Sequence, residues 1–195
     1  STMIKLGVLG STKGTDLQAI INAINFGDLK AQVSVVISDR SKSFILERAR
    51  LNKIPSFFVS AKNRTRSQFD SEVTRLLLKN GAELVLLIGF MRILSASFCQ
   101  KWHKKIINVH PSLLPKYSGG MDTNVHSEVL KNKDLETGCT IHFVTKKVDS
   151  GPILIQKKCP VNKEDTVSSL KKKVQKLEGE AFIEAIKTLK NRDTT

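Results

Sequence analysis

Cysteine is scarce in this chain, which has three cysteines among 195 residues. Cys99, Cys139 and Cys159 lie far apart and form no CxxC pair. Such a set cannot build the even-numbered disulfide framework of a small secreted domain. Together with the histidines it is also too scattered for a zinc site. We therefore expect a protein of the reducing cytoplasm that holds no metal.

Long apolar segments are also missing, and the sequence as given leads us to expect no leader segment. The longest uninterrupted apolar segment, Leu84–Met91, is far shorter than the roughly 18 residues that indicate a membrane span. The N-terminus has no basic region followed by an apolar core. Ser1 and Thr2 precede Met3, and we expect them to derive from the expression vector. The sequence therefore predicts a protein that does not engage a membrane.

Acidic residues are few, 18 against 32 lysines and arginines, which gives a net charge of +14. Such a charge fits a nucleic-acid-binding protein. The basic residues are nevertheless spread along the chain, with local concentrations at Lys101–Lys105 and Lys171–Lys176. In the second segment they alternate with apolar residues, as on a solvated helix face. We favour a basic surface without a nucleic-acid role, and attraction of small anions is compatible with either interpretation.

The apolar pattern predicts strands that alternate with helices. Alternation of this kind is typical of an α/β domain with a mainly parallel, twisted sheet flanked by helices. Two later strands can add to that sheet in antiparallel fashion, and a long helix follows them. Neither a repeat nor a linker is evident, so we expect one domain. The predicted strands are Ile4–Leu9, Val33–Ser38, Ile54–Val59, Leu84–Ile88, Ile106–His110, Thr140–Thr145 and Ile153–Val161; the predicted helices follow Asp16, cover Phe44–Leu51 and Phe69–Lys79, and end the chain at Val167–Leu189.

A glycine-bearing loop, Gly10–Asp16, joins the first predicted strand to the first helix. Free amides and the positive end of the helix dipole favour an anion such as phosphate at this place. Lys13 adds a cation there, whereas Asp16 adds an opposing charge. The loop matches neither GxGxxG nor GxxxxGK[ST], and Thr15 or Asp16 can equally serve as a helix cap. Phosphate binding and simple capping both remain open on this pattern.

A second candidate is Asn108-Val109-His110-Pro111, at the end of a predicted strand. Residues two apart on a strand project to the same face, so Asn108 and His110 can reach one reacting atom. Pro111 keeps His110 extended. An amide donates hydrogen bonds to an oxyanion, and an imidazole moves protons near neutral pH. Taken alone, the pattern equally describes a turn after a buried strand.

A third candidate is Asp149, within the Val148–Pro152 turn region. Asp is common in turns, but a carboxylate beside His110 would stabilise the charged form of the imidazole. His142 lies on an alternating strand and can face either the core or an active site. Spacing alone does not decide these contacts.

Three separated segments together resemble the folate-dependent formyltransferases. They are Gly89–Leu94 (GFMRIL), Asn108–Tyr117 (NVHPSLLPKY) and Thr140–Pro152 (TIHFVTKKVDSGP). The resemblance extends from Ile4 over almost the whole chain, and the segments occur in the order in which the family has them. It favours the functional interpretation of His110.

The resemblance implies a Rossmann-like formyltransferase fold and transfer of a formyl group from 10-formyltetrahydrofolate, used as co-substrate, to an amine. Two branches of the family carry an additional domain, which is RNA-binding in one branch and regulatory in the other. A chain of 195 residues has no space for either, so we expect a single formyltransferase domain over residues 1–195. The implied acceptor is the glycine amine of 5-phosphoribosylglycinamide, in de novo purine synthesis. Small molecules are thus the expected partners, and the chain is expected to be a monomer or a homodimer.

The matching positions imply the roles of individual residues. Asn108, protonated His110 and Asp149 would form the catalytic group, with Asp149 keeping His110 cationic. The implied acceptor-binding residues are Gly14, Thr15, Asp16, Gln175 and Glu178; the implied folate-binding residues are Arg66, Met91, Arg92, Ile93, Leu94, Thr145, Lys146, Lys147 and Val148.

The chain departs from the family at two places. Asp16 stands where the family usually has Asn, which puts a carboxylate close to the implied phosphate. The loop Ser118–His126 is longer than the common version, and His126 matches the histidine of that loop. Alternative functions are formyl transfer to another amine, such as an amino sugar nucleotide, and nucleic-acid binding. A dinucleotide-dependent oxidoreductase is poorly supported, because GxGxxG is missing and Asp39 is the one candidate acidic residue after the second strand.

Overall fold

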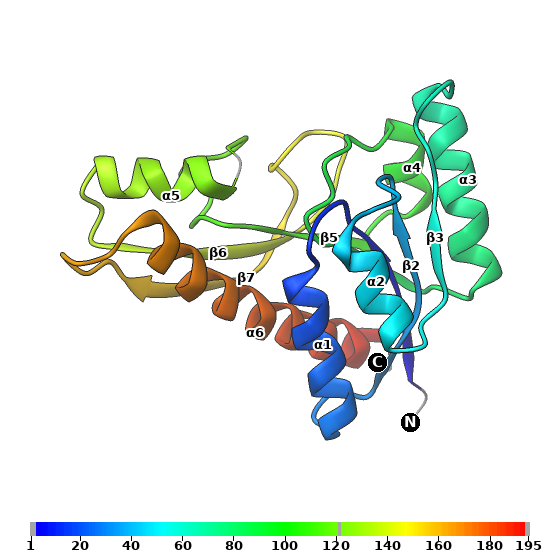
Figure 1. Cartoon of the computed structure of the whole chain (residues 1–195), viewed down its shortest axis with the longest axis horizontal. Coiled ribbons are helices and arrows are strands. Elements are labelled where there is room, and N and C mark those ends of the chain that lie inside the picture. The colour runs from blue at the N-terminus through cyan, green and yellow to red at the C-terminus, as the bar shows by residue number, and fades with distance from the viewer. Residues whose placement is uncertain (1–2, 121, 194–195) are drawn as a thin grey trace.

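The protein is a seven-stranded sheet with helices on both faces (Figure 1). The computed structural model describes residues 3–120 and 122–193, so Ser1, Thr2, Met121, Thr194 and Thr195 lie outside the described residues. The strands are β1 (Ile4–Leu9), β2 (Ala31–Ser38), β3 (Ser56–Phe58), β4 (Leu84–Leu87), β5 (Ile106–His110), β6 (Glu136–Phe143) and β7 (Ile153–Pro160). The helices are α1 (Thr15–Phe26), α2 (Phe44–Leu51), α3 (Arg66–Lys79), α4 (Ala96–Lys101), α5 (Asp122–Lys131) and α6 (Val167–Asp193).

The sheet has the strand order β3-β2-β1-β4-β5-β6-β7. Strands β1 to β5 run parallel, whereas β6 pairs antiparallel with both β5 and β7. The predicted mainly parallel sheet with an antiparallel C-terminal addition is therefore confirmed.

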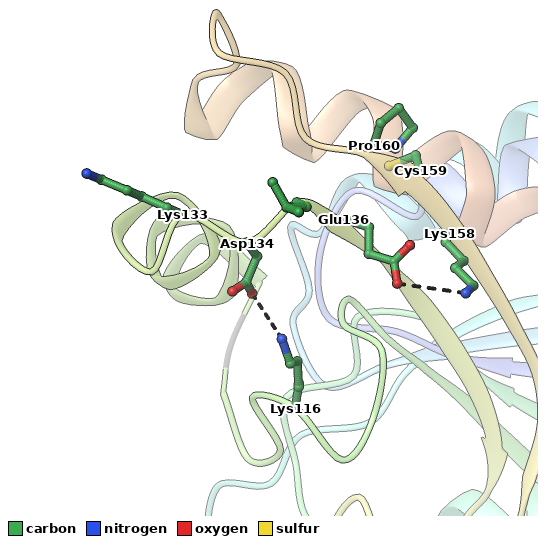
Figure 2. A pocket seen from close by; sticks show the side chains of 8 residues that line it. Lys116, Lys133, Asp134, Glu136, Lys158, Cys159 and Pro160 are labelled. Atoms are coloured by element: carbon green, nitrogen blue, oxygen red, sulfur yellow. Dashed lines mark ion pairs between the residues drawn. The ribbon is translucent and has the colours of Figure 1, made fainter.

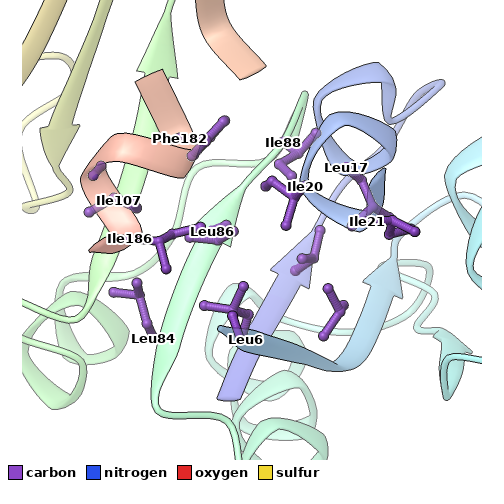
Figure 3. Packing of buried hydrophobic residues seen from close by; sticks show 14 of the residues in the cluster. Leu6, Leu17, Ile20, Ile21, Leu84, Leu86, Ile88, Ile107, Phe182 and Ile186 are labelled. Carbon is purple, nitrogen blue, oxygen red and sulfur yellow. The ribbon is translucent and has the colours of Figure 1, made fainter. Parts of the chain in front are cut away.

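Apolar side chains from both sheet faces build two cores. Helices α1, α2 and α6 pack on one face, and α3 and α4 pack on the other. Figure 3 shows how Phe182 and Ile186 of α6 lie against Leu86 of β4 and Ile107 of β5, with Ile20 of α1 beside them. Burial of both faces explains why β4 is an unbroken apolar run. Among the described residues, none of the helices combines the length and apolarity needed to cross a membrane.

The strand order creates a crevice between β1 and β4. The chain moves outward from β1 to β2 and β3, then returns to place β4 on the other side of β1. The strand order reverses at this place, which is called a topological switch point. The loops after β1 and β4 lead to opposite faces of the sheet there, and open α/β sheets bind ligands in the crevice between such loops. The two loops stay close, because Ser11 N donates to Gly89 O at 3.1 Å and Met91 N donates to Ser11 Oγ at 2.9 Å.

Two helices were absent from the sequence-based prediction. Residues 118–126, which were expected to be a loop, include the start of α5. Val125 and Val129 of α5 pack on Leu170 of α6, so burial against another element stabilises a helix of weak intrinsic propensity. The other, α4, has six residues, which is too short for a helical apolar pattern. In addition, β6 begins at Glu136 rather than at the predicted Thr140.

Candidate active site

The end of β5 presents Asn108 and His110 on one face of the sheet. Antiparallel pairing with β6 places Asn108 opposite His142 and His110 opposite Thr140. His110 is buried, with 4% of its surface exposed, and Asn108 is half-buried. Residues directly opposite each other in an antiparallel pair have side chains in contact. The register therefore adds His142 to the predicted pair.

Asp149 reaches this pair from the connection between β6 and β7. Its Oδ2 lies 3.5 Å from His110 Nδ1, and its Oδ1 lies 3.8 Å from His142 Nε2. Gly119 N donates to Oδ2 at 2.7 Å, which orients the carboxylate. The structure thus brings the three predicted catalytic residues together.

Gly151 lets the connection pass close to the end of β6. A Cβ atom at this position would lie 1.7 Å from Phe143 O, so a side chain would displace the connection. Asp149 itself has a left-handed backbone, with φ 52. A short polar residue adopts this conformation at modest cost. Asp149 and Gly151 thus suit the path that brings the carboxylate to His110.

His142 orients the amide of Asn108. His142 is 2% exposed, and burial lowers its pKa. The charge of His110 also lowers that pKa, whereas the bond to the Phe143 carbonyl and the charge of Asp149 raise it. The neutral ring donates from Nδ1 to Phe143 O at 2.9 Å and accepts at Nε2 from Asn108 Nδ2 at 3.2 Å. This assignment gives both ring nitrogens of His142 a partner. It uses one of the two hydrogens on Asn108 Nδ2, so the other can be donated to a different acceptor.

His110 has its own fixed proton. Its Nε2 lies 2.8 Å from the carbonyl oxygen of Tyr117. A carbonyl oxygen can only accept, so Nε2 carries a hydrogen. Nδ1 is the nitrogen that faces Asp149. His110 can therefore exchange a proton at Nδ1 while Nε2 keeps its own.

A cavity of about 470 Å³ opens beside the N-terminus of α1. We call it the α1 cavity. The loop after β1, the segment after β4, the end of β5 and one face of α6 contribute to it. Its walls include all five predicted acceptor-binding residues, Gly14, Thr15, Asp16, Gln175 and Glu178, together with Lys13, Lys171, Asn108 and His110. Lys171, Gln175 and Glu178 share a helix face because they are spaced by four and three residues.

Gly14 shapes the entrance to α1. It is the N-cap residue, with φ 70, and α1 begins at Thr15. A Cβ atom on Gly14 would lie 2.5 Å from Ile45 Cγ1, so a larger residue does not fit. A glycine cap has no side chain to bond the first amides of the helix, which leaves them directed at the cavity. Asp16 lies in the first turn, where the dipole favours a carboxylate, and is 6% exposed.

A second cavity, of about 200 Å³, lies beyond the end of β4. We call it the β4 cavity. It is lined by the predicted folate-binding residues Met91, Arg92, Ile93, Leu94, Thr145, Lys146, Lys147 and Val148, together with Asn108, His142 and Asp149. Met91, Ile93 and Val148 expose large apolar surfaces, 42%, 56% and 57% respectively. An apolar rim with nearby backbone groups is typical of a site for a flat aromatic ligand.

Arg66 is the predicted folate-binding residue that the structure does not bring to this cavity. Among the described residues that line either cavity, Arg66 does not occur. It is exposed at the start of α3. Phe69, three residues after Arg66, stacks with Arg92 of the β4 cavity. The guanidinium carbon of Arg92 lies 4.5 Å from the centroid of the Phe69 ring.

Asn108 lines both cavities, as do Phe90 and Met91. His110 belongs to the α1 cavity and Asp149 to the β4 cavity, and the two side chains meet between them. A ligand in one cavity can thus react with a ligand in the other beside Asn108.

The cysteines nearby are poor nucleophiles. Burial is the main cause that raises the pKa of Cys99, which lines the β4 cavity. Burial, with the charges of Glu178 and Asp16, raises the pKa of Cys139 to about 12. Both thiols therefore stay protonated at neutral pH, and a thiol is a much weaker nucleophile than a thiolate.

Sequence reasoning left one contributor to the site open, His142, and missed two others. The orientation of His142 depends on the register of β5 with β6. The carbonyl of Tyr117 is a backbone group, which leaves no mark in the sequence. Lys171 sits in a run of lysines, and its spacing from Gln175 and Glu178 was the available signal.

Comparison with known proteins gives a consistent result. A family model described as formyl transferase matches residues 4–186. The trifunctional purine biosynthetic protein adenosine-3 of Chironomus tentans is 41% identical over 187 residues, which are 94% of this chain and 13% of that protein. The phosphoribosylglycinamide formyltransferase of Haemophilus influenzae is 36% identical over 186 residues, which are 95% of this chain and 86% of that protein.

The same relationship is found among solved structures. Glycinamide ribonucleotide transformylase 1 from Symbiobacterium toebii superposes with a TM-score of 0.88 and 37% sequence identity, covering 94% of this chain and 86% of that one. The chain thus spans less than a fifth of the trifunctional relatives and most of the monofunctional ones.

Proposed function

This chain belongs to the formyl transferase family, and from that premise we propose that it formylates the glycine amine of 5-phosphoribosylglycinamide. The formyl donor is 10-formyltetrahydrofolate, and the products are phosphoribosyl-N-formylglycinamide and tetrahydrofolate, in de novo purine synthesis. The observation that carries the proposal is the cluster of Asn108, His110, His142 and Asp149 between two cavities. Direct transfer between two bound substrates needs this arrangement, because the reacting groups must meet at one point.

The β4 cavity is the proposed folate site. Its apolar rim suits the pteridine ring, and the backbone of residues 91–94 supplies hydrogen-bonding groups at the cavity wall. Lys146 and Lys147 line the same cavity, and their charge favours the carboxylates of the folate tail. Arg66, exposed on α3, remains a predicted contact for the part of the folate that extends beyond the cavity.

The α1 cavity is the proposed acceptor site. The amides at the start of α1 and the ammonium groups of Lys13 and Lys171 would bind the phosphate. Gln175 and Glu178 lie on the α6 side, where they would contact the ribose hydroxyls. Asp16 places a negative charge beside the phosphate, and the two lysines of the cavity offset it.

Attack of the acceptor amine on the formyl carbon gives a tetrahedral intermediate with an anionic oxygen and a cationic nitrogen. Asn108 donates to that oxygen with the Nδ2 hydrogen that does not bond His142. His110, protonated at Nδ1 beside the Asp149 carboxylate, is the second donor. Loss of one such donor costs about 2.7 to 4 kcal/mol of transition-state stabilisation.

The collapse of the intermediate requires a proton at the departing folate nitrogen. The cationic amine nitrogen loses that proton, and His110 with Asp149 passes it on, directly or through water. The bond between the formyl carbon and the folate nitrogen then breaks, its electron pair stays on that nitrogen, and the carbonyl reforms. General acid-base help of this kind contributes roughly 10² to 10⁴ in rate.

The test is an assay with 10-formyltetrahydrofolate and 5-phosphoribosylglycinamide, in which absorbance reports release of the deformylated folate. Asn108→Ala, His110→Ala and Asp149→Asn should each lower kcat about 10² to 10⁴-fold and change the two KM values little. His103→Ala is the control, because that histidine is exposed and lies away from both cavities.

Two results would contradict the proposal. Wild-type turnover in the three variants would remove these residues from the chemistry. Absence of turnover with this acceptor, together with transfer to an amino sugar nucleotide, would assign the α1 cavity to a different amine.

A further inference from the structure

The segment of residues 112–120 brings a backbone carbonyl to the catalytic histidine. Tyr117 has a left-handed backbone, with φ 58. Its carbonyl oxygen accepts from His110 Nε2 at 2.8 Å and from Gly120 N at 3.3 Å. A left-handed conformation costs a residue with a side chain roughly 1 to 2 kcal/mol. Other contacts must therefore hold Tyr117 in this conformation.

The phenol of Tyr117 supplies those contacts. Its hydroxyl donates to Asp134 Oδ2 at 2.7 Å, and Asn132 Nδ2 donates to the hydroxyl at 2.9 Å. Asp134 and Asn132 come from the turn between α5 and β6. The Asp134 carboxylate is 13% exposed and lies 3.7 Å from Lys116 Nζ. Figure 2 marks this ion pair with a dashed line. A hydroxyl bound to a carboxylate is a strong, charge-assisted donor.

The phenol also keeps its proton. Burial raises the pKa of Tyr117, and the bond to Asp134 acts in the same direction, whereas the bond from Asn132 opposes both. The hydroxyl thus remains a donor to Asp134 over the neutral pH range.

We propose that Tyr117 and Asp134 are positioning residues for His110. Asp134 holds the phenol, the phenol holds the left-handed backbone, and the Tyr117 carbonyl then fixes the hydrogen of His110 on Nε2. This leaves Nδ1 as the nitrogen that faces Asp149 and exchanges the proton. The assignment deepens the proposed formyl transfer and rests on it.

The geometry explains why the carbonyl matters. His110 is buried, so a ring nitrogen without a partner is costly there. If the Tyr117 carbonyl turns away, the ring can place its hydrogen on Nδ1 instead and donate it to Asp149. The neutral ring then takes up a further proton at Nε2 rather than at Nδ1. The cation no longer forms and discharges at the nitrogen that faces Asp149, and the proton path is interrupted.

A neighbouring ion pair offers a matched control. Glu136 and Lys158 lie in the same surface hollow as Asp134, with 3.7 Å between Oε1 and Nζ (Figure 2). Their side chains are 56% and 65% exposed. The Glu136 carboxylate pairs with that lysine, whereas the Asp134 carboxylate binds the phenol. Loss of Glu136 therefore changes the charge of the hollow to the same extent and spares Tyr117.

The experiment compares Asp134→Ala, Tyr117→Phe, their double variant, Asp134→Asn and Glu136→Ala in the full chain. Asp134→Ala and Tyr117→Phe should each lower kcat about tenfold, with both KM values within about twofold of the wild type. The double variant should be no slower than either single one. Asp134→Asn retains an oxygen that accepts from the phenol, so it should restore most of kcat, and Glu136→Ala should match the wild type.

Long-range ¹H–¹⁵N NMR of the histidine rings, without substrates, provides the second measurement. At a pH high enough for the ring to be neutral, the wild type and Asp134→Asn should show His110 with its hydrogen on Nε2, and Asp134→Ala and Tyr117→Phe should show a shift toward Nδ1. An unchanged His110 signal in those two variants overturns the assignment, as does an equal loss of kcat in Glu136→Ala. Because this measurement uses no acceptor, it decides the positioning role even if the proposed acceptor is wrong.

Discussion

Burial keeps the ring of His142 neutral, and the neutral ring can accept a hydrogen bond from the amide of Asn108. The pKa of His142 lies below its ordinary value of 6.5. As the pH falls below 6.5, the histidine ring of the unfolded chain binds a proton that the ring of the folded protein does not yet bind. The unfolded state is then favoured, so this contribution to stability is complete above about pH 6.5 and is lost below it.

The first prediction concerns this pH dependence. Replacement of His142 by Gln removes the titrating ring, so the free energy of unfolding should fall less steeply than in the wild type as the pH falls below about 6.5. Urea denaturation at several pH values measures it. His103→Gln, at an exposed position, should keep the wild-type slope. Parallel profiles of the wild type and the His142 variant would show that His142 titrates normally.

A second prediction separates two glycines that share a left-handed backbone. Gly14 has φ 70 and no space for a Cβ atom, whereas Gly27 has φ 91 and nothing within 4 Å of that position. Gly14→Ala should raise the KM of the phosphorylated acceptor at least tenfold and leave the KM of the folate unchanged, because the helix entrance moves. Gly27→Ala should cost about 1 kcal/mol of stability and change neither KM. Equal KM values for the phosphorylated acceptor in the two variants would show that the start of α1 does not take part in acceptor binding.

Among single residues, those with a sequence signature were the predictable ones. Asn108 and His110 stand two apart on a strand, and Asp149 belongs to a turn motif; the structure brings all three together. For His142, the residue type alone does not distinguish a core histidine from an active-site histidine. Its orientation is set by the cross-strand pairing of Asn108 with His142. A cross-strand register is a long-range property, which a local pattern does not contain.

At the scale of elements, α6 connects the core with the α1 cavity. Its C-terminal half buries Phe182 and Ile186 against the sheet, and Lys171, Gln175 and Glu178 of its N-terminal half line the cavity. Packing of the C-terminal half against the sheet therefore sets the position of the N-terminal half at the cavity. Stability and the proposed acceptor binding thus depend on the same helix.

The third prediction follows from that packing. Phe182 is fully buried in the core shown in Figure 3. Phe182→Ala should lower the free energy of unfolding by about 3 to 5 kcal/mol, because apolar burial is lost and a cavity remains. Leu78→Ala, at a position on α3 that is 55% exposed, should cost well under 1 kcal/mol. Urea denaturation of the two variants checks the difference, and comparable losses would argue against the α6 packing.

Elements with strong periodicity were predicted to within a few residues. β1 and α2 have the predicted bounds, and the predicted long last helix begins at Val167 as observed. By contrast, α5 has three β-branched residues and a preceding pair of glycines, so its sequence favours a loop. Burial of Val125 and Val129 against α6 outweighs that local preference.

At the scale of the whole molecule, the alternation of strands and helices predicted a parallel sheet, but not the order of its strands. That order places the loops after β1 and β4 side by side and so creates the ligand crevice. The resemblance to a known family predicted a formyl transferase, and the match of the family model confirms that membership. Composition and periodicity alone left the family open.

The net charge of +14 leads to the fourth prediction. Like charges repel more strongly in the compact state than in the unfolded chain. Raising the NaCl concentration from about 0.01 M to about 0.1 M shortens the screening length from about 30 Å to about 10 Å and should raise the urea midpoint. A variant with Lys172→Glu and Lys176→Glu, both exposed on α6, should respond less. A midpoint that falls with salt in the wild type would show that favourable ion pairs dominate.

If the α1 and β4 cavities hold the two proposed substrates, the position of Asn108 in the wall between them also determines the kinetic order of the reaction. A carbon that passes straight from one small molecule to another never becomes attached to the polypeptide, so both molecules must be present before any bond changes. Initial rates measured at several fixed concentrations of either substrate should then give intersecting double-reciprocal lines. Radiolabelled formyl donor should not exchange its label with unlabelled tetrahydrofolate while the amine is withheld.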